Sequence, residues 1–364
     1  MRQILIVGDY PPPYGGLSVQ VAALRQRLAM RGDTDVRVLD IGARRRERRP
    51  GCLPVHGPVD LATSVLVHAR RGFIPHVHTN GHNPRSWIVT VGCTSAARVG
   101  GRRAIVSLGS GRMPAFLETA SPAMRALARA ALTVAGAVIV RNERARAALE
   151  TFGVSPAKLV VLPGFYGVGP EEIGDVPREA LDFRAAHEPL LGAIATRGPE
   201  YGLSLLVDAA ARLRPRYPRL GVLLLGPDEL ADGCPSWVLP VGEQERPALL
   251  ASMQALDVFV RPTYFDGDAS SVREALALGV RVVTSDTDFR PEGVWRFPPG
   301  DADALAATID RALAGRPTRG ESTSLPALLA LYDSLGHSGM PAAAPRTAVP
   351  DAPVRDASGR VGLG

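Results

Sequence analysis

The chain has 364 residues, of which 46% are hydrophobic and 21% are charged. At about 100–200 residues per domain, this length predicts two domains or three. An ordinary share of apolar residues excludes collagen-like, disulfide-scaffold and wholly disordered proteins. Lys158 is the only lysine among 42 basic residues, and the formal net charge is +6. A site that needs a cation must therefore almost always use arginine.

The three cysteines, Cys52, Cys93 and Cys234, are widely spaced. Their spacing matches neither a disulfide framework nor a zinc finger, and it favours a reducing compartment. The first apolar run, residues 4–7, is too short for a signal peptide. No apolar stretch of the sequence reaches the roughly 18 residues of a membrane-spanning helix. These features together predict a cytoplasmic protein.

Short apolar and β-branched runs alternate with helical patterns along the chain. In the first half, strands are predicted over 4–8, 36–41, 76–80, 104–108, 137–140 and 159–162. In the second half, strands are predicted over 190–196, 220–226, 238–241, 258–261 and 281–285. Most runs are almost entirely apolar, which is typical of parallel strands covered on both faces. Spacings such as Leu17, Val21, Leu24 and Leu28 predict amphipathic helices between them. The fold class is therefore α/β, with a doubly wound sheet in each half.

The stretch 163–175 is rich in glycine and has the composition of a hinge between the two halves. We predict an N-terminal Rossmann-like domain over 1–165 and a C-terminal Rossmann-like domain over 166–323. A last helix is predicted within 324–338. Residues 339–364 contain four prolines and no aromatic residue, which predicts a disordered tail.

Residues 8–16, Gly-Asp-Tyr-Pro-Pro-Pro-Tyr-Gly-Gly, connect the first predicted strand to a helix. Gly15 and Gly16 would let the backbone come close to a ligand, and the helix start would offer free N–H groups to an anion. The glycine spacing is not that of the dinucleotide fingerprint. A phosphate site and a rigid strand-to-helix turn are therefore both consistent with this segment.

A second candidate site follows the strand predicted over 258–261 and continues into a helix. Asp266 and Glu274 stand eight positions apart in this segment. A carboxylate accepts hydrogen bonds from vicinal hydroxyl groups, and a helix start binds anions. The segment is thus suited to a ligand that has both sugar hydroxyls and phosphates.

These segments together resemble the GT-B glycosyltransferases of family 4, retaining enzymes that use nucleotide-sugars. The resemblance covers residues 1–335. It is carried, in this order, by residues 8–16, Met30-Arg31-Gly32, residues 153–163, residues 197–202 and the acidic segment. It implies two Rossmann-like domains facing a cleft, with the last helix packed back toward the N-terminal domain. It also implies transfer of a hexose-type sugar to a glycan or lipid-linked glycan, with no metal ion or other cofactor.

The resemblance further implies roles for individual residues. Glu274 matches the carboxylate that binds the nucleotide ribose, and Asp266 matches the one that contacts sugar hydroxyls. Arg197 matches an arginine on the diphosphate, and it would stabilise the leaving group together with helix N-termini. The backbone N–H groups implied to bind the sugar and diphosphate belong to Gly267, Asp268, Ala269, Ser270 and Ser271.

Three positions depart from the family's pattern. Tyr201, on the donor side, replaces a lysine that contacts the diphosphate, and loss of a charged contact costs about 1.5–3 kcal/mol. Gly109, on the acceptor side, stands where a histidine contacts the transferred sugar. Asp266 is one methylene shorter than the family's glutamate, and a shift of about 1 Å can cost about 10²-fold in rate. Arg273 would either supply the missing cation or face solvent.

These departures leave two other hypotheses open. The first is a catalytically impaired GT-B protein that acts as a binding partner or scaffold, because fold does not fix function. The second is a sugar-nucleotide epimerase of the same fold, which would need acid and base groups that the sequence does not identify.

Histidines lie within and just after the third predicted strand, in the segment His76-Val77-His78-Thr79-Asn80-Gly81-His82. The carboxyl end of such a strand faces the ligand crevice in a doubly wound sheet. We therefore predict that His78, Asn80 and His82 border the acceptor, near Gly109. A structural role at the strand end is the alternative. The histidine spacing matches no zinc motif, and no metal site is expected.

Five arginines lie within residues 44–49. A solvated loop is the simplest interpretation. Peripheral contact with an anionic membrane is the functional alternative, at about 1 kcal/mol per basic residue near the surface. Nucleic acid is not an expected partner, because no aromatic residues alternate with these arginines.

Overall fold

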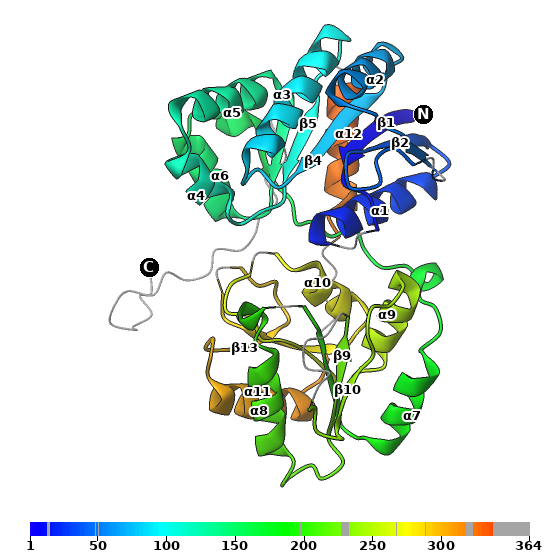
Figure 1. The fold of residues 1–364 in the computed structure, drawn as a ribbon, viewed down its shortest axis with the longest axis vertical. Coiled ribbons are helices and arrows are strands. Elements are labelled where there is room, and N and C mark those ends of the chain that lie inside the picture. Colours follow the sequence, from blue (N-terminus) through cyan, green and yellow to red (C-terminus); the bar gives the residue numbers. More distant parts are fainter. Residues whose placement is uncertain are drawn as a thin grey trace, which may run out of the picture.

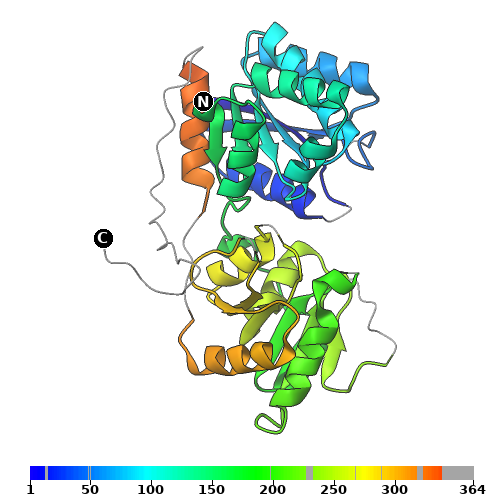
Figure 2. The same cartoon turned by 90° about the vertical axis from the view of Figure 1, so that its left-hand side faces the viewer.

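The computed structural model describes residues 1–12, 15–47, 49, 51–196, 198–226, 233–266, 268–287, 289–317 and 323–337. The chain forms two lobes, and each is built on a parallel sheet with helices on both faces (Figure 1, Figure 2). The predicted α/β class with two doubly wound sheets is confirmed. The predicted tail over 339–364 lies outside the described residues, and the residue bounds of the two domains stay predictions.

The first sheet has seven parallel strands in the order β3-β2-β1-β4-β5-β6-β7. They are β1 (Arg2–Gly8), β2 (Thr34–Asp40), β3 (Cys52–Leu53), β4 (Ile74–Thr79), β5 (Ile105–Leu108), β6 (Ala137–Val140) and β7 (Leu159–Val161). Side chains alternate between the two faces of a strand. In β1, Ile4 and Ile6 therefore enter one hydrophobic core, and Leu5 and Val7 enter another.

Helices cover both faces of this sheet. They are α1 (Gly16–Ala29), α2 (Pro58–Arg70), α3 (Pro84–Val99), α4 (Met113–Thr119), α5 (Pro122–Val134) and α6 (Glu143–Thr151). Asparagine side chains cap two of them. Asn83 accepts a hydrogen bond from the Ser86 backbone N–H at 2.9 Å, and Asn142 accepts one from Ala145 at 2.8 Å. Each cap satisfies an N–H group that a helix start leaves free.

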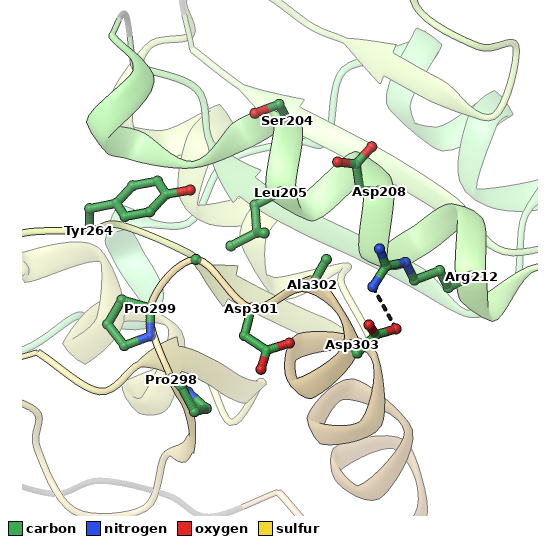
Figure 3. A pocket seen from close by; sticks show the side chains of 11 residues that line it. Ser204, Leu205, Asp208, Arg212, Tyr264, Pro298, Pro299, Asp301, Ala302 and Asp303 are labelled. Atoms are coloured by element: carbon green, nitrogen blue, oxygen red, sulfur yellow. Dashed lines mark ion pairs between the residues drawn. The ribbon is translucent and has the colours of Figure 1, made fainter.

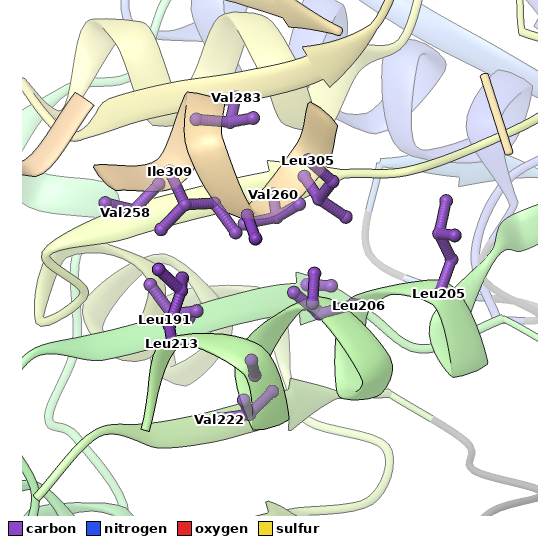
Figure 4. Packing of buried hydrophobic residues seen from close by; sticks show 14 of the residues in the cluster. Leu191, Leu205, Leu206, Leu213, Val222, Val258, Val260, Val283, Leu305 and Ile309 are labelled. Atoms are coloured by element: carbon purple, nitrogen blue, oxygen red, sulfur yellow. The ribbon is translucent and has the colours of Figure 1, made fainter. Parts of the chain in front are cut away.

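The second sheet has six parallel strands in the order β10-β9-β8-β11-β12-β13. They are β8 (Leu190–Ile194), β9 (Gly221–Leu225), β10 (Val238–Pro240), β11 (Val258–Arg261), β12 (Arg281–Ser285) and β13 (Trp295–Phe297). The helices of this lobe are α7 (Arg178–Ala186), α8 (Leu203–Leu213), α9 (Arg246–Gln254), α10 (Ser270–Ala277) and α11 (Ala302–Ala314). Figure 4 shows how strand residues such as Leu191 and Val260 pack against Leu206 of α8 and Ile309 of α11.

The last helix, α12 (Leu325–His337), returns to the first sheet (Figure 1). Leu328 and Leu335 enter the core beside Ile4. The Tyr332 hydroxyl lies 2.7 Å from Nδ1 of His76, and Asp333 accepts a hydrogen bond from Nε of Arg2 at 2.7 Å. The chain therefore crosses between the lobes twice, once after β7 and once before α12.

The eleven predicted strands are present, with ends that differ by two residues at most. Two strands were not predicted, β3 and β13. Both are short, and both lie at an edge of their sheet, where a strand has one neighbouring strand. Within the described ranges, no helix has the length and apolar character needed to cross a membrane.

Candidate functional site

The two lobes meet where α1 and α10 begin (Figure 1). Helix α1 follows β1, and α10 follows β11, so both start at the carboxyl edge of a parallel sheet. Nε2 of Gln20 on α1 donates a hydrogen bond to Oγ of Ser270 on α10 at 3.3 Å. Ligands of doubly wound sheets bind at this edge, and the start of α10, where donor residues are predicted, lies at it.

Asp266 is held by two arginines through a single carboxylate oxygen. Its Oδ2 accepts hydrogen bonds from Nε of Arg261 at 3.0 Å, Nη1 of Arg290 at 3.2 Å and Oγ1 of Thr263 at 3.2 Å. Its Oδ1 accepts no hydrogen bond from any residue that the structure describes. Burial alone would raise the pKa of Asp266, but Arg261 and Arg290 outweigh burial and lower that pKa. The side chain is therefore an ionised carboxylate with one fixed oxygen and one available oxygen.

Arg261 also contacts Tyr201, the residue that replaces the family's lysine. Its guanidinium carbon lies 5.6 Å from the centre of the Tyr201 ring, within the range of a cation–π contact. The cluster of Arg261, Arg290 and Asp266 has two positive charges and one negative charge. A net positive charge therefore lies beside Tyr201, although the tyrosine itself carries none.

Glu274 is arranged in the same way as Asp266. Its Oε1 accepts a hydrogen bond from Nη1 of Arg246 at 2.7 Å, while Oε2 has no donor among the described parts of the chain. Glu274, Arg246, Ser270 and Gln20 line a small cavity of about 10 Å³ between the lobes. A cavity of this size holds about one water molecule. Burial would lower the pKa of Arg246, but Glu274 and Glu172 outweigh burial and raise it.

The side chain of Asp268 is occupied within the protein. Its Oδ1 accepts a hydrogen bond from Nε of Arg273 at 2.5 Å, and its Oδ2 accepts one from the Gly164 backbone N–H at 3.3 Å. Only 1% of the Asp268 side chain is exposed, and 5% of that of Arg273. Of the two alternatives for Arg273, exposure to solvent is wrong, and its charge is balanced by Asp268. Only the backbone N–H of Asp268 is left for its predicted role.

The start of α10 can bind an anion. Its cap, Ala269, has no side-chain acceptor, and the first turn contains no acidic residue. The N–H groups of Ser270 and Ser271 are therefore free to donate hydrogen bonds, and they lie at the positive end of the helix dipole. Two residues predicted to lie near this point, Arg197 and Gly267, are outside the described residues.

The start of α1 is open. Gly15 caps the helix in an extended conformation, and its N–H donates to Oγ of Ser18 at 2.9 Å. A Cβ atom added to Gly16 would meet nothing within 4 Å. Space is therefore available beside Gly16, and the donor-side role of both glycines stays a prediction.

On the acceptor side, the prediction for His78 is wrong. His78 lies on β4 two residues after His76 and therefore shares its sheet face. Its side chain is fully buried in the core and does not border an open acceptor site. The two rings lie 4.1 Å apart under α1 and α12. Burial, together with His76 and Arg141, places the pKa of His78 well below its usual value. Both histidines are therefore neutral core residues.

Asn80 and Gly109 do come together. The Gly109 N–H donates to the Thr79 carbonyl at 2.8 Å, and a Cβ atom at Gly109 would lie 3.9 Å from Oδ1 of Asn80. The same Cβ would lie 3.1 Å from Leu17 at the start of α1. His82 is half-buried. Asn80, Gly109 and His82 therefore remain candidates for the acceptor side.

A groove of about 740 Å³ lies between α8 and the start of α11 (Figure 3). Tyr264 lines one end of it. Two acidic side chains that line the groove already have partners. Oδ1 of Asp301 accepts a hydrogen bond from the Ala304 backbone N–H at 2.9 Å, and Asp303 pairs with Arg212 at 2.6 Å. Within the described ranges, no group of histidine, cysteine and acidic side chains has the arrangement of a metal site.

Comparison with known proteins agrees with the two-lobed α/β fold. Residues 188–315 match the family model of glycosyl transferases group 1. No curated protein matches the sequence. The trehalose-phosphate synthase of Burkholderia xenovorans, described as UDP-forming, is 14% identical with a TM-score of 0.63, covering 93% of this chain and 100% of the other. Anabaena HepE in complex with UDP and glucose is 16% identical with a TM-score of 0.61, covering 86% and 90%. Sucrose-phosphate synthase of Thermosynechococcus elongatus is 21% identical with a TM-score of 0.60, covering 92% and 96%.

The chain has the GT-B fold. The resemblance predicted from the sequence is confirmed by the family match within the second lobe and by similarity in fold to solved structures that cover 86–93% of this chain. The sequence of this GT-B chain did not predict the three arginines that contact the two carboxylates, Arg246, Arg261 and Arg290. Arg261 had a weak signal, because it is the charged end of an otherwise apolar strand. The other two had none, since arginine is common throughout this sequence.

Gly202 is required at the turn that places Tyr201. Its φ is +68°, and an added Cβ would lie 2.1 Å from the carbonyl oxygen of Pro262. We expect Gly202→Ala to lower the free energy of unfolding by about 1–3 kcal/mol, measured by urea denaturation. Gly92→Ala, within α3 and with open space around it, is the control and is expected to stabilise the protein. Equal effects of the two substitutions would contradict this prediction.

Proposed function

We propose that the protein is a retaining glycosyltransferase that moves a hexose-type sugar from a nucleoside-diphosphate sugar to a glycan or lipid-linked glycan, without a metal ion. The observation that carries this proposal is the pair Asp266 and Glu274 on either side of the α10 start. Each carboxylate has one oxygen fixed by arginine and one oxygen left for a hydroxyl group. The α10 start between them suits a diphosphate.

The proposed chemistry assigns each group a task. Oε2 of Glu274 accepts hydrogen bonds from the ribose, and Oδ1 of Asp266 accepts them from the sugar. When the bond between the sugar and the diphosphate breaks, negative charge grows on the leaving oxygen. We assign stabilisation of that charge to the N–H groups of Ser270 and Ser271 and to the Arg197 side chain. The net positive charge around Arg261 adds to this field.

A catalytically impaired GT-B protein remains the second candidate. Tyr201 and Gly109 favour it, because neither can make the contact that the family's lysine or histidine makes. The positive charge of Arg261 against the Tyr201 ring favours an active enzyme. Turnover of any nucleotide-sugar by the purified chain would exclude the impaired protein.

The acceptor and the location of the protein are proposals as well. Asn80, His82 and Gly109 form the proposed acceptor side. For contact with an anionic membrane, Arg44 and Arg46 are exposed, whereas Arg49 is held by Asp40 and by the Pro11 carbonyl. Fewer charges are thus available than the sequence of this loop indicates. The free cysteines favour a cytoplasmic location.

Titration of the purified protein with UDP, GDP, ADP and dTDP, with and without Mg²⁺, tests the proposal. We expect clear binding of one nucleotide without metal. Glu274→Gln is expected to weaken that binding about tenfold, because it removes a charged hydrogen-bond acceptor. Glu179→Gln, at an exposed position on α7, is the matched control and should bind as the wild type does. Binding of none of the four would contradict the donor site, and a requirement for Mg²⁺ would contradict metal-independent transfer.

A further inference from the structure

Helix α1 contacts the second lobe through two polar side chains on one face. Gln20 and Arg27 lie seven positions, or two helical turns, apart. Gln20 reaches Ser270, as described above. Nη1 of Arg27 contacts Glu171 at 3.0 Å, and its Nη2 contacts Glu172. Glu171 and Glu172 belong to the short helix Pro170–Glu172, which follows the first sheet in the chain and contacts α9 of the second lobe.

Four side chains of alternating charge form a row that begins at Arg27 and ends at Glu274, the carboxylate predicted to bind the ribose. Glu172 contacts Arg27 through Oε1 and lies 3.5 Å from Nε of Arg246 through Oε2. Nη1 of Arg246 then lies 2.7 Å from Oε1 of Glu274. The exposed fractions of the four side chains are 15%, 3%, 17% and 7%. We call Arg27, Glu172, Arg246 and Glu274 the charge ladder.

Two carboxylates compete for one guanidinium within the charge ladder. Arg246 lies closer to Glu274, at 2.7 Å, than to Glu172, at 3.5 Å. Glu172 already has a cationic partner in Arg27, and the Gly169 N–H also donates to its Oε1 at 3.0 Å. Loss of Arg27 would leave Glu172 buried without its own partner, which is costly. Arg246 would then be drawn toward Glu172 and away from Glu274.

We propose that Arg27, Glu172 and Arg246 are positioning residues that hold Glu274 for the ribose, so that recognition of the ribose depends on contact between the two lobes. This inference rests on the proposed function. Arg27 lies on the first lobe and has no contact with Glu274. Its contribution passes through Glu172 and Arg246, and separation of α1 from Glu172 weakens the ribose site without any change in the site itself.

The inference is tested by the dissociation constant of a 2′-deoxy nucleotide divided by that of the corresponding ribonucleotide. The probe is whichever of UDP, GDP and ADP binds the wild type best, with its 2′-deoxy counterpart. A charged hydrogen bond to the 2′-hydroxyl gives an expected wild-type ratio of about ten. We expect Arg27→Gln to reduce the ratio to about three, which corresponds to half of that free-energy difference. Arg31→Gln, an exposed neighbour paired with Asp33, is the control and should keep the wild-type ratio.

A second substitution separates positioning from a general structural effect. In the Arg27→Gln protein, Glu172→Gln removes the charge that competes for Arg246, so the double variant should recover the wild-type ratio. A structural defect would instead grow with the second substitution. Arg246→Gln should lower the ratio by itself, and this variant tests the charge ladder even where Arg27→Gln does not fold.

The outcomes are distinct. An unchanged ratio in Arg27→Gln or Arg246→Gln, with normal wild-type binding, overturns the inference and leaves the proposed function intact. A further fall of the ratio in the double variant overturns it as well. Binding of no nucleoside diphosphate by the wild type overturns the proposed function, and the inference with it.

Discussion

We expect Asp266→Ala to lower the free energy of unfolding by about 3–5 kcal/mol, which is the cost of breaking a buried ion pair by removing one partner. Arg290 has only 1% of its side chain exposed, and Arg261 has 13%. Both donate to the same oxygen of Asp266. Without that carboxylate, two neighbouring positive charges lose their counter-charge, and one of them cannot reach water.

Urea denaturation of the wild type and the variant at pH 7 measures this change. Asp266→Asn keeps a hydrogen-bond acceptor but loses the charge, so its effect is expected to lie between those of the wild type and Asp266→Ala. Asp286→Ala is the control, because Asp286 is 57% exposed and pairs with Arg296 at the surface. A surface pair contributes about 0–1 kcal/mol. An Asp266→Ala protein no less stable than Asp286→Ala would contradict the ion cluster around Asp266.

The Asp266→Asn variant separates two roles of Asp266, namely stabilisation of the fold and contact with the sugar. If Oδ1 binds sugar hydroxyls, Asp266→Asn should reduce sugar transfer more than its modest loss of stability accounts for. The comparison is made at a temperature where both proteins are folded, with nucleotide binding as the second readout. Transfer lost with nucleotide binding retained is the expected pattern, because the nucleotide is assigned to Glu274.

The fold was predictable because both sheets are parallel and covered on both faces. Such strands are nearly continuous apolar runs, so β8, β9 and β11 stand out from their flanking segments in the sequence. The edge strands β3 and β13 have only two and three residues, and β13 has an arginine between its two aromatic residues. Runs that short are not distinguishable from turns by hydrophobic pattern.

The candidate site was predictable only where spacing along one segment defines it. Asp266 and Glu274 belong to one loop and the helix that follows it, so their relation is visible in the sequence. Their arginine partners are less visible. Arg246 comes from α9 and Arg290 from the segment after β12, and tertiary structure alone brings them together. Since lysine is almost absent, arginine occurs everywhere in this chain and does not mark a site.

The error at His78 has a different cause. The prediction placed this residue at the carboxyl end of a strand, which is correct, but the end of a strand has two faces and an edge. His76 and His78 point to the same face, and that face is covered by α1 and α12. Asn80 lies beyond the end of β4 and is free of this constraint. Helix α12, which covers these histidines, comes from a distant part of the sequence, because Tyr332 is 256 residues from His76.

We expect the stability of the protein to fall by about 2 kcal/mol between pH 7 and pH 5 through His76 alone. Burial lowers the pKa of His76 from 6.5 to about 3, and the charge of Arg141 acts in the same direction. Between these two values, the unfolded chain binds a proton that the folded chain does not, so acid favours unfolding. The effect begins near pH 6.5 and grows until about pH 3. His78, whose pKa is also well below its usual value, adds to it.

Urea denaturation at pH 7, 6 and 5 measures the slope, and substitution identifies its source. In His76→Gln the side chain no longer titrates, so the fall in stability from pH 7 to pH 5 should be smaller than in the wild type by about 2 kcal/mol. The variant is less stable at pH 7, because the hydrogen bonds between His76 and the hydroxyl groups of Tyr332 and Ser107 are altered. His56→Gln, at an exposed position, should keep the full slope. Equal slopes in His76→Gln and the wild type would show that the acid sensitivity originates elsewhere than in the core between β4, α1 and α12.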